Sequence, residues 1–395
     1  MWTIILTLYN QVLLQTAQNF LQGLYPPLAS QNSPLATEKL TNGTEIESPL
    51  NGYQFIQIHG ESEEEPETIW IKGDDNCPSY EDASESYKES TEYIQTLDSS
   101  KAFYSRFIPQ LRDIMGLENV NYAHAYDVFD LLNVGSIHNQ SIADAITIDE
   151  LTQLRYYANQ WEWGSNYNQT QADRSIGGMA LAGGILRQLN ETVSGKGKLK
   201  FSLMTGSYDT FLAFFGLTSL TSASSNFMGL PNYGASMAFE LFTTENTTSF
   251  PSNLDDLNVR FLFRNGTDSS EQLTAFPLFG QQETSLKYTD FATKLNSLAI
   301  TSVGQWCTRC ASTASFCGAS DDTTPSQTTG VDDGSRSGLT NVQAGVVGAM
   351  VTLAVIGLCG VLFWLLKRRR SALGVTAIPA TKERRGSETD GSTSV

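Results

Sequence analysis

Histidine is scarce in this sequence, with three among 395 residues. His124 and His138 show no metal-ligand spacing, and His59 is not preceded by arginine, so we interpret all three as surface or structural residues. No Gly-x-Ser-x-Gly segment occurs, which argues against the nucleophile elbow of a serine hydrolase. Heptads and longer internal repeats are also missing, so neither a coiled coil nor a solenoid is expected.

Basic residues are outnumbered as well. The sequence has 25 Lys and Arg against 42 Asp and Glu, a formal net charge of −17. A body this acidic is a poor partner for nucleic acid, and we interpret the excess of acid as the solvated surface of a secreted domain. No motif indicates a cofactor or a metal, so we expect neither.

Five cysteines occur, and Cys359 lies within an apolar run. The other four form an even set, which in an oxidising compartment indicates two disulfides, and the sequence leaves all three pairings open. A Cys-x-x-Cys spacing near the end of this set also allows a zinc site, but no histidine lies close to it. The four residues are Cys77, Cys307, Cys310 and Cys317.

The apolar run covers residues 344–366, and 23 uncharged residues are enough to span a bilayer as a helix. Lys367–Arg370 follow at once, which places the C-terminus in the cytosol. A GPI signal is the alternative, although such signals do not usually carry a basic tail. We therefore expect a type I protein of the plasma membrane or secretory pathway, with an ectodomain at 1–318, a Ser/Thr/Asp/Gly-rich stalk at 319–343, a single C-terminal transmembrane helix at 344–366 and a cytosolic tail at 367–395.

Six N-x-[ST] sequons agree with this topology, because all of them precede the apolar run. We expect a glycoprotein. The acceptor residues are Asn42, Asn139, Asn168, Asn190, Asn246 and Asn265.

Residues 1–10 resemble a weak secretory leader, because the apolar segment is short and contains no Lys or Arg. A type I membrane protein needs a route into the secretory pathway, so we expect the chain to lack its true beginning. Residues 11–24 have helical apolar spacing, which ends at Pro26-Pro27.

Further along, helical spacing at 84–170 predicts a helical insertion in an α/β domain. Glycine pairs at 177–178 and 183–184 lie inside a predicted helix at 172–190, so we expect this helix to pack closely against another element. Strands are predicted at 235–243 and 258–263, and helical spacing returns at 288–298.

Residues 198–217 give the best indication of a site for chemistry in this sequence. A short apolar strand ends at Ser207-Tyr208-Asp209 and turns straight into a helix. Such a turn exposes backbone N–H groups, which hold phosphate in α/β enzymes. The simpler interpretation makes Asp209 the N-cap of a helix at 210–215 and Tyr208 a partly buried packing residue.

Segments between residues 15 and 317 resemble, in order and spacing, the fungal histidine acid phosphatases, a branch of the histidine phosphatase superfamily. The resemblance implies a phosphoglycerate mutase-like fold, which is a three-layer α/β core with a helical insertion. It also implies phosphomonoester hydrolysis through a phosphohistidine. The segments are Gln15–Pro27, Asn76–Pro78, Tyr126–Asn139, Ile176–Leu189, Lys198–Leu217, Tyr233–Leu241, Val259–Phe263 and Trp306–Cys317.

The catalytic parts implied by this resemblance are mostly absent. The family uses the His of an Arg-His-Gly motif on its first strand, arginines around the phosphate, and a His-Asp pair whose Asp protonates the leaving alcohol. Arg-His-Gly does not occur, so we expect the first strand to be missing and the sheet to have a gap or an unprotected edge. Val12 stands at a family arginine position, Tyr208 stands at the His of the pair, and Asp209 alone matches.

The sequence therefore predicts a membrane-anchored, extracytoplasmic protein similar to histidine acid phosphatases but catalytically impaired or incomplete at its N-terminus. Such a pseudoenzyme or binding module would hold a phosphomonoester ligand weakly. The alternative is an active acid phosphatase whose Arg-His-Gly segment is lost from the gene model, with Asp209 as its proton donor.

Overall fold

The computed structural model describes residues 2–31 and 34–318. The expected stalk at 319–343, membrane span at 344–366 and tail at 367–395 lie outside these residues. Within the two described ranges, no helix is long and apolar enough to cross a bilayer.

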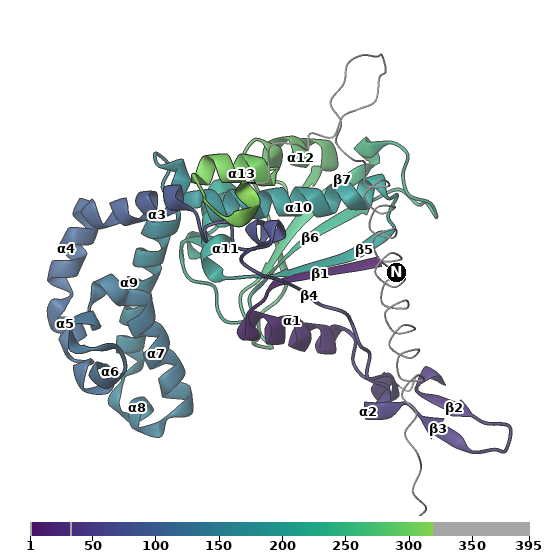
Figure 1. Ribbon diagram of the computed structural model, residues 1–395, viewed down its shortest axis with the longest axis horizontal. Helices are drawn as coiled ribbons and strands as arrows, with labels where there is room; N and C mark the ends of the chain where they lie inside the picture. Colours follow the sequence, from purple (N-terminus) through teal and green to yellow (C-terminus); the bar gives the residue numbers. More distant parts are fainter. Residues whose placement is uncertain (1, 32–33, 319–395) are drawn as a thin grey trace, which may run out of the picture. The chain divides into compact units, whose positions relative to one another are not determined.

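A parallel sheet of three strands forms one half of the core (Figure 1). Its central strand β1 is the segment compared above with a secretory leader, and the structure corrects that comparison, because Ile5 and Thr7 are fully buried. The sequence of a parallel strand that is covered on both faces is a continuous apolar run, and a secretory leader has the same pattern. In spatial order the strands are β4 (His59–Glu61), β1 (Trp2–Leu8) and β5 (Leu199–Thr205).

Helix α1 (Gln11–Leu24) follows β1 and packs against this sheet. Its N-cap is Asn10, whose side-chain oxygen accepts a hydrogen bond from the backbone N–H of Val12 at 2.9 Å. Ala17 and Leu21 are the buried residues of its inner face. The helix predicted at 11–24 is therefore confirmed.

The second sheet is antiparallel, and its central strand β7 pairs on one side with β6 and on the other with β8 and β9. In the part of the chain that the structure describes, β5 pairs with β1 alone and β6 with β7 alone, so each of these two strands is an edge strand with one unpaired side. An unprotected edge of this kind is what the sequence analysis expects. The strands are β6 (Ser236–Thr243), β7 (Leu257–Arg264), β8 (Thr274–Phe276) and β9 (Ser285–Lys287).

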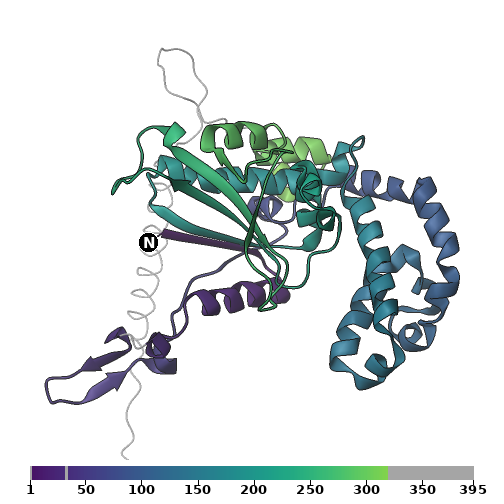
Figure 2. The ribbon, with the colours of Figure 1, turned by 180° about the vertical axis from the view of Figure 1, so that it is seen from behind.

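Helix α10 (Ile176–Ser194) contains both glycine pairs, and its packing explains them. A Cβ at Gly183 would lie 1.8 Å from the carbonyl oxygen of Ile300, and one at Gly178 would lie 2.5 Å from the backbone nitrogen of Phe214. The predicted close approach is confirmed. Figures 1 and 2 show α10, α12 and α13 on one side of the strands and α1 on the other. The remaining helices of the core are α11 (Tyr208–Leu217), α12 (Tyr288–Asn296) and α13 (Val303–Cys310).

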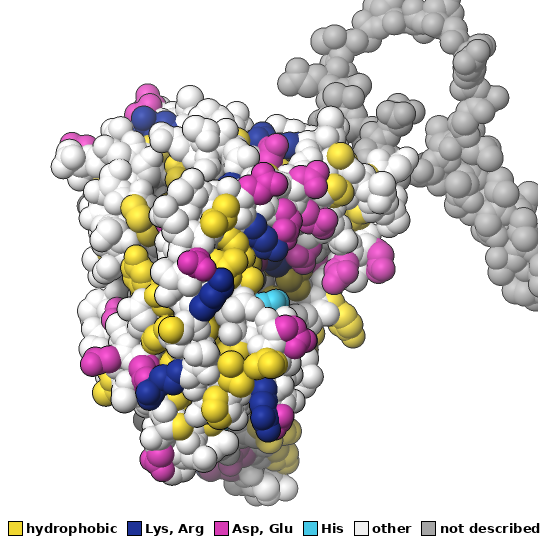
Figure 3. All heavy atoms as spheres, turned by 90° about the vertical axis from the view of Figure 1, so that its left-hand side faces the viewer, with side chains coloured by type: hydrophobic (Ala, Val, Ile, Leu, Met, Phe, Trp, Pro, Cys, Tyr) yellow, Lys and Arg dark blue, Asp and Glu magenta, His cyan; other side chains and the backbone are white. Residues whose placement is uncertain are grey.

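The stretch at 84–170 is helical, and its interior is aromatic. The ring of Tyr157 lies 5.7 Å from that of Tyr104 and 5.9 Å from that of Tyr122. Figure 3 views the chain from this side, where apolar, acidic and basic side chains are intermixed. The helices of this region and the one before it are α3 (Pro78–Glu85), α4 (Thr91–Ser99), α5 (Lys101–Ser105), α6 (Ile108–Met115), α7 (Ala125–His138), α8 (Gln140–Ala145) and α9 (Ile148–Asn166).

A small hairpin lies between α1 and β4 in the chain. Its strands β2 (Thr37–Lys39) and β3 (Glu45–Glu47) pair with each other, and all their residues are exposed. The short turn α2 (Pro49–Gly52) follows. In Figure 1 the hairpin lies beyond the end of α1, away from both sheets.

Two disulfides link Cys77 to Cys310 and Cys307 to Cys317. The predicted pair of disulfides is confirmed, and the structure chooses among the three pairings that the sequence leaves open. The zinc alternative is wrong, because these cysteines are bonded to one another. Across residues 2–31 and 34–318, no group of His, Cys, Asp and Glu side chains could hold a metal ion.

Candidate functional site

Asp209 lies where β5 ends and α11 begins. Ser207 is the N-cap of α11, so the interpretation of Asp209 as an N-cap is wrong. The helix starts at Tyr208, earlier than expected, and Asp209 is in its first turn, where the helix dipole favours a carboxylate. The Asp209 carboxylate accepts a hydrogen bond from the backbone N–H of Thr210 at 2.8 Å.

A loop at residues 71–77, called here the 71–77 loop, packs beside this turn. The hydroxyl of Thr210 donates to the carbonyl oxygen of Ile71 at 3.3 Å. The indole N–H of Trp306 donates to the carbonyl oxygen of Gly73 at 2.6 Å. The disulfide at Cys77 closes the far end of the loop. The loop is therefore fixed at both ends and in its middle.

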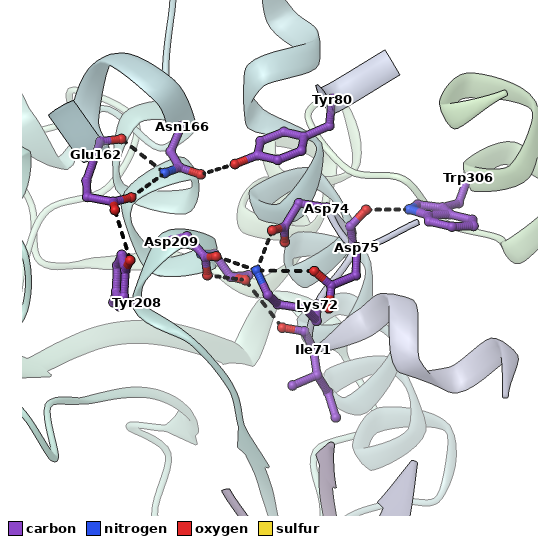
Figure 4. Close-up of polar contacts among 12 residues, drawn as sticks. Ile71, Lys72, Asp74, Asp75, Tyr80, Glu162, Asn166, Tyr208, Asp209 and Trp306 are labelled. Carbon is purple, nitrogen blue, oxygen red and sulfur yellow. Dashed lines mark hydrogen bonds and ion pairs between the residues drawn. The ribbon is translucent and has the colours of Figure 1, made fainter. Parts of the chain in front are cut away.

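Lys72 points from this loop into the turn and meets three carboxylates (Figure 4). Its ammonium is in ion-pair contact with Asp74 and Asp209, and lies 3.6 Å from an oxygen of Asp75. The side chains of Lys72 and Asp209 are only 14% and 16% exposed. Burial lowers the pKa of Lys72, but the attraction of Asp209, Asp74 and Asp75 outweighs it and raises that pKa above its usual range. Lys72 is thus a fixed cation at this site.

Asp74 is deeply buried, with its side chain 5% exposed. Burial, followed by repulsion from Asp209, raises the pKa of Asp74. One of its oxygens has no hydrogen-bond partner among the described residues. That oxygen lies over Gly177 of α10, where a Cβ would come within 2.8 Å of it. Glycine at this position therefore makes room for the carboxylate.

Tyr208 turns away from Lys72 and belongs to a second set of contacts (Figure 4). Its hydroxyl donates to the buried carboxyl of Glu162 at 2.9 Å, and its ring lies 4.6 Å from that of Tyr126. The other oxygen of Glu162 accepts from the side-chain amide of Asn166 at 3.1 Å, and Tyr80 donates to the same amide at 3.0 Å. Burial, then the charge of Asp209, raises the pKa of Glu162 to about 8.

The remaining sequence-predicted residues lie elsewhere. Val12 is 70% exposed at the start of α1. His59 begins β4, while His124 and His138 flank α7 in the helical region. In the described ranges, no hydrogen bond or ion pair joins a histidine or an arginine to Lys72, Asp209, Tyr208 or Glu162. The site therefore has one cation and four carboxyl groups.

A family model described as "Histidine phosphatase superfamily (branch 2)" matches residues 13–264, which is more than half of the chain. The chain belongs to this superfamily. Tyr208 and Asp209 lie inside the matched range, and Val12 lies just before it. A lysosomal acid phosphatase of Xenopus laevis is 28% identical over 141 residues, which cover 36% of this chain and 28% of that protein. The match thus spans less than a third of the relative's length.

Sequence reasoning missed Lys72, Asp74 and Glu162. Lys72 and Asp74 lie just before the Cys-Pro motif, in the segment Ile-Lys-Gly-Asp-Asp-Asn-Cys-Pro. A lysine close to two acidic residues and to a cysteine is the signal that the sequence offers here. Glu162 lies between two tryptophans in α9, where a carboxyl group among large aromatic residues indicates burial. The contacts of Lys72 with Asp209 and of Glu162 with Tyr208 join segments that are distant in the sequence and have no local signal.

Proposed function

We propose that this chain is a catalytically inactive, membrane-anchored member of the histidine phosphatase superfamily whose phosphate site is closed by its own lysine. The observation that carries this proposal is the ion pair between Lys72 and Asp209. Asp209 is the only residue that matches the catalytic pattern implied by the family resemblance. As the partner of the Lys72 ammonium, its carboxylate is committed to a structural contact.

Electrostatics also disfavour a phosphomonoester at this place. A phosphate group needs cations or N–H donors around its oxygens. The lysine charge is already compensated by Asp74 and Asp209, and Asp75 adds a further carboxylate. Two like charges 4 Å apart repel by roughly 1 kcal/mol even at the dielectric constant of water. The phosphomonoester ligand expected from the sequence is therefore bound weakly or not at all.

The residues at the catalytic positions of the family pattern also argue against activity. Tyr208 has a phenol where the family pattern has an imidazole, and burial raises its pKa well above the usual range, so it stays neutral. Val12 offers no charge to a phosphate oxygen. Among the described residues, neither His59, His124 nor His138 shares a hydrogen bond or ion pair with Lys72, Tyr208 or Asp209, so none is seen in place to carry a phosphoryl group there.

The proposal is tested by assaying the purified full-length protein with a chromogenic phosphomonoester from pH 4 to pH 8. We expect turnover at the level of the Asp209→Ala variant across this range, and no rise in melting temperature on addition of millimolar inorganic phosphate. Robust turnover that Asp209→Ala abolishes would overturn the proposal. The substitution leaves Lys72 bound to Asp74, so comparison of the two melting curves shows whether the variant is folded.

The same proposal places the domain outside the cytosol as a glycoprotein held by one membrane span at 344–366. The apolar run, the basic cluster at 367–370 and the six sequons support it, as do the two disulfides, which persist in oxidising compartments. Carbonate extraction of membranes, with protease digestion of sealed vesicles and a C-terminal epitope tag, tests this topology. Release by carbonate, or protection of the ectodomain in right-side-out plasma membrane vesicles, contradicts it.

A second candidate is an active acid phosphatase that is completed by an additional strand carrying Arg-His-Gly. The open edges of β5 and β6 favour it, since a strand with one unpaired side can take up another. Such a strand would supply a nucleophile but would leave Tyr208 and Val12 unchanged. Adding a synthetic peptide with this motif to the assay distinguishes the candidates, because only the second predicts that turnover appears.

A further inference from the structure

The tripeptide Asn-Gly-Thr occurs in two of the six sequons, at 42–44 and at 265–267. Their sequences are identical, so any difference in modification must come from their surroundings. The proposed extracytoplasmic topology brings both into contact with the glycosylation machinery, and the inference below rests on that topology. The structure places the two tripeptides in opposite environments.

Asn42 lies in the turn of the β2–β3 hairpin and is exposed. Its side-chain oxygen accepts the backbone N–H of Thr44 at 3.0 Å, while Leu40 and Thr44 close the turn with a backbone hydrogen bond of 2.8 Å. No hydrogen bond engages its amide nitrogen among the described residues. The space is open as well, since a Cβ built on Gly43 would meet no atom within 4 Å.

Asn265 lies at the end of β7 and is half-buried. Its side-chain oxygen accepts the backbone N–H of Asn232 at 2.8 Å, and its carbonyl oxygen accepts the side-chain amide of the same residue at 3.2 Å. A Cβ on Gly266 would lie 3.0 Å from the Cβ of Asn232. Thr267 is exposed, and its methyl group lies against Gly234, where a Cβ would come within 2.4 Å of it.

We propose that Asn42 carries an N-linked oligosaccharide and that Asn265, in the same tripeptide, does not. In the transfer, the amide nitrogen of Asn42 forms a bond to the anomeric carbon of a sugar held on a lipid diphosphate. The bond from that carbon to the diphosphate oxygen breaks, its electron pair leaves with the diphosphate, and one amide proton is lost to a base. The hairpin turn presents this nitrogen with its oxygen already held by Thr44.

The glycan also has a physical role on this hairpin. Leu40, next to β2, and Ile46 of β3 flank the turn and are 37% and 50% exposed, and among the described residues these two strands pair only with each other. A two-stranded hairpin alone is only marginally stable in water. A hydrated sugar at Asn42 screens these two apolar side chains from other molecules. At Asn265 the side chain that would carry the same sugar is half-buried and held by Asn232 through its oxygen.

The experiment expresses the full-length protein in a eukaryotic secretory cell and measures occupancy of each site by mass spectrometry of glycopeptides. Thr44→Val and Thr267→Val remove the sequon hydroxyl with nearly unchanged side-chain shape, and Thr44→Ser keeps the sequon. We expect the protein to lose one glycan in Thr44→Val, to lose none in Thr267→Val, and to keep full mass in Thr44→Ser. Occupancy of Asn265 equal to that of Asn42, or an unchanged mass in Thr44→Val, would overturn the inference.

A second arm of the experiment separates this inference from the topology. In this arm the same chain carries an added cleavable secretory leader, so that the ectodomain enters the lumen of the secretory pathway even if the natural chain does not. An unmodified Asn42 in this arm overturns the site assignment. A glycan at Asn42 in this arm alone supports the site assignment and overturns the proposed topology instead.

Discussion

The ammonium of Lys72 is ion-paired with the carboxylate of Asp209, which joins the 71–77 loop to the first turn of α11 across 137 positions of the sequence. Both side chains are mostly buried. Removing one partner of a buried ion pair is strongly destabilising, because it leaves the other charge buried without compensation. This contact therefore closes the site and also holds two distant segments together.

Replacing Lys72 by methionine is expected to destabilise the protein strongly at pH 7. The variant leaves Asp74 and Asp209 close together without a cation, and breaking a buried pair typically costs about 3 kcal/mol or more. Urea denaturation measures the change in the free energy of unfolding. The control is Lys101→Met, since Lys101 at the start of α5 and Asp98 of α4 form an exposed pair, whose loss should cost far less than that of a buried one.

A loss for Lys72→Met no larger than for Lys101→Met would contradict the ion-pair assignment. The double variant with Asp209→Asn provides a second check. Removal of one of the two carboxylates relieves their repulsion, so the double variant should be more stable than Lys72→Met alone. A double variant less stable than either single one would mean that the two side chains do not interact in this way.

The pKa of Glu162 predicts how stability depends on pH. This pKa is raised from 4.5 to about 8 in the folded protein, mainly by burial. Between these values the folded protein keeps a proton that the unfolded chain loses, so stability falls as the pH rises, by at most about 1.4 kcal/mol per unit from this group. Burial likewise raises the pKa values of Asp74 and Asp75, and these groups act in the same direction.

Glu162→Gln removes this group's titration and should flatten the fall in stability between pH 5 and pH 8. Denaturation curves at unit intervals of pH give the slope for each protein. Glu81→Gln on α3 is the matched control, because Glu81 is exposed and should leave the slope unchanged. If wild type and Glu162→Gln have parallel stability curves, Glu162 ionises normally and its burial has no such effect.

Much of the fold follows from local patterns in the sequence. The helix at 11–24 has its N-cap, apolar spacing and terminating prolines in one short stretch, and its predicted bounds are confirmed. The glycine pairs of α10 indicate close packing, because glycine weakens a helix interior and is expected there only where a neighbour needs the space. Strand β1 was misjudged, since a buried parallel strand and a leader share the same apolar composition.

The site was predicted only in part, and the missing part is non-local. Asp209 and Tyr208 could be found because they follow a strand and begin a helix. Lys72 reaches them from a loop that is distant in the sequence, and Glu162 reaches them from α9. Such approaches are fixed by tertiary packing. The disulfide pairing could not be chosen from the sequence for the same reason, because tertiary packing brings Cys77 beside Cys310.

The open edge of β6 predicts self-association on heating. All residues of this strand are half-buried, and its outer side is unpaired in the described structure. A lysine on such an edge opposes pairing with a second chain. We expect Ala238→Lys, at a half-buried position opposite Leu262 on β7, to lower light scattering of the fragment 1–318 during thermal unfolding.

Ala102→Lys adds the same charge at an exposed position on α5 and should leave scattering unchanged. Cooperative unfolding of the unmutated fragment without aggregation, or an equal benefit from both lysines, would show that the β6 edge is protected by other means.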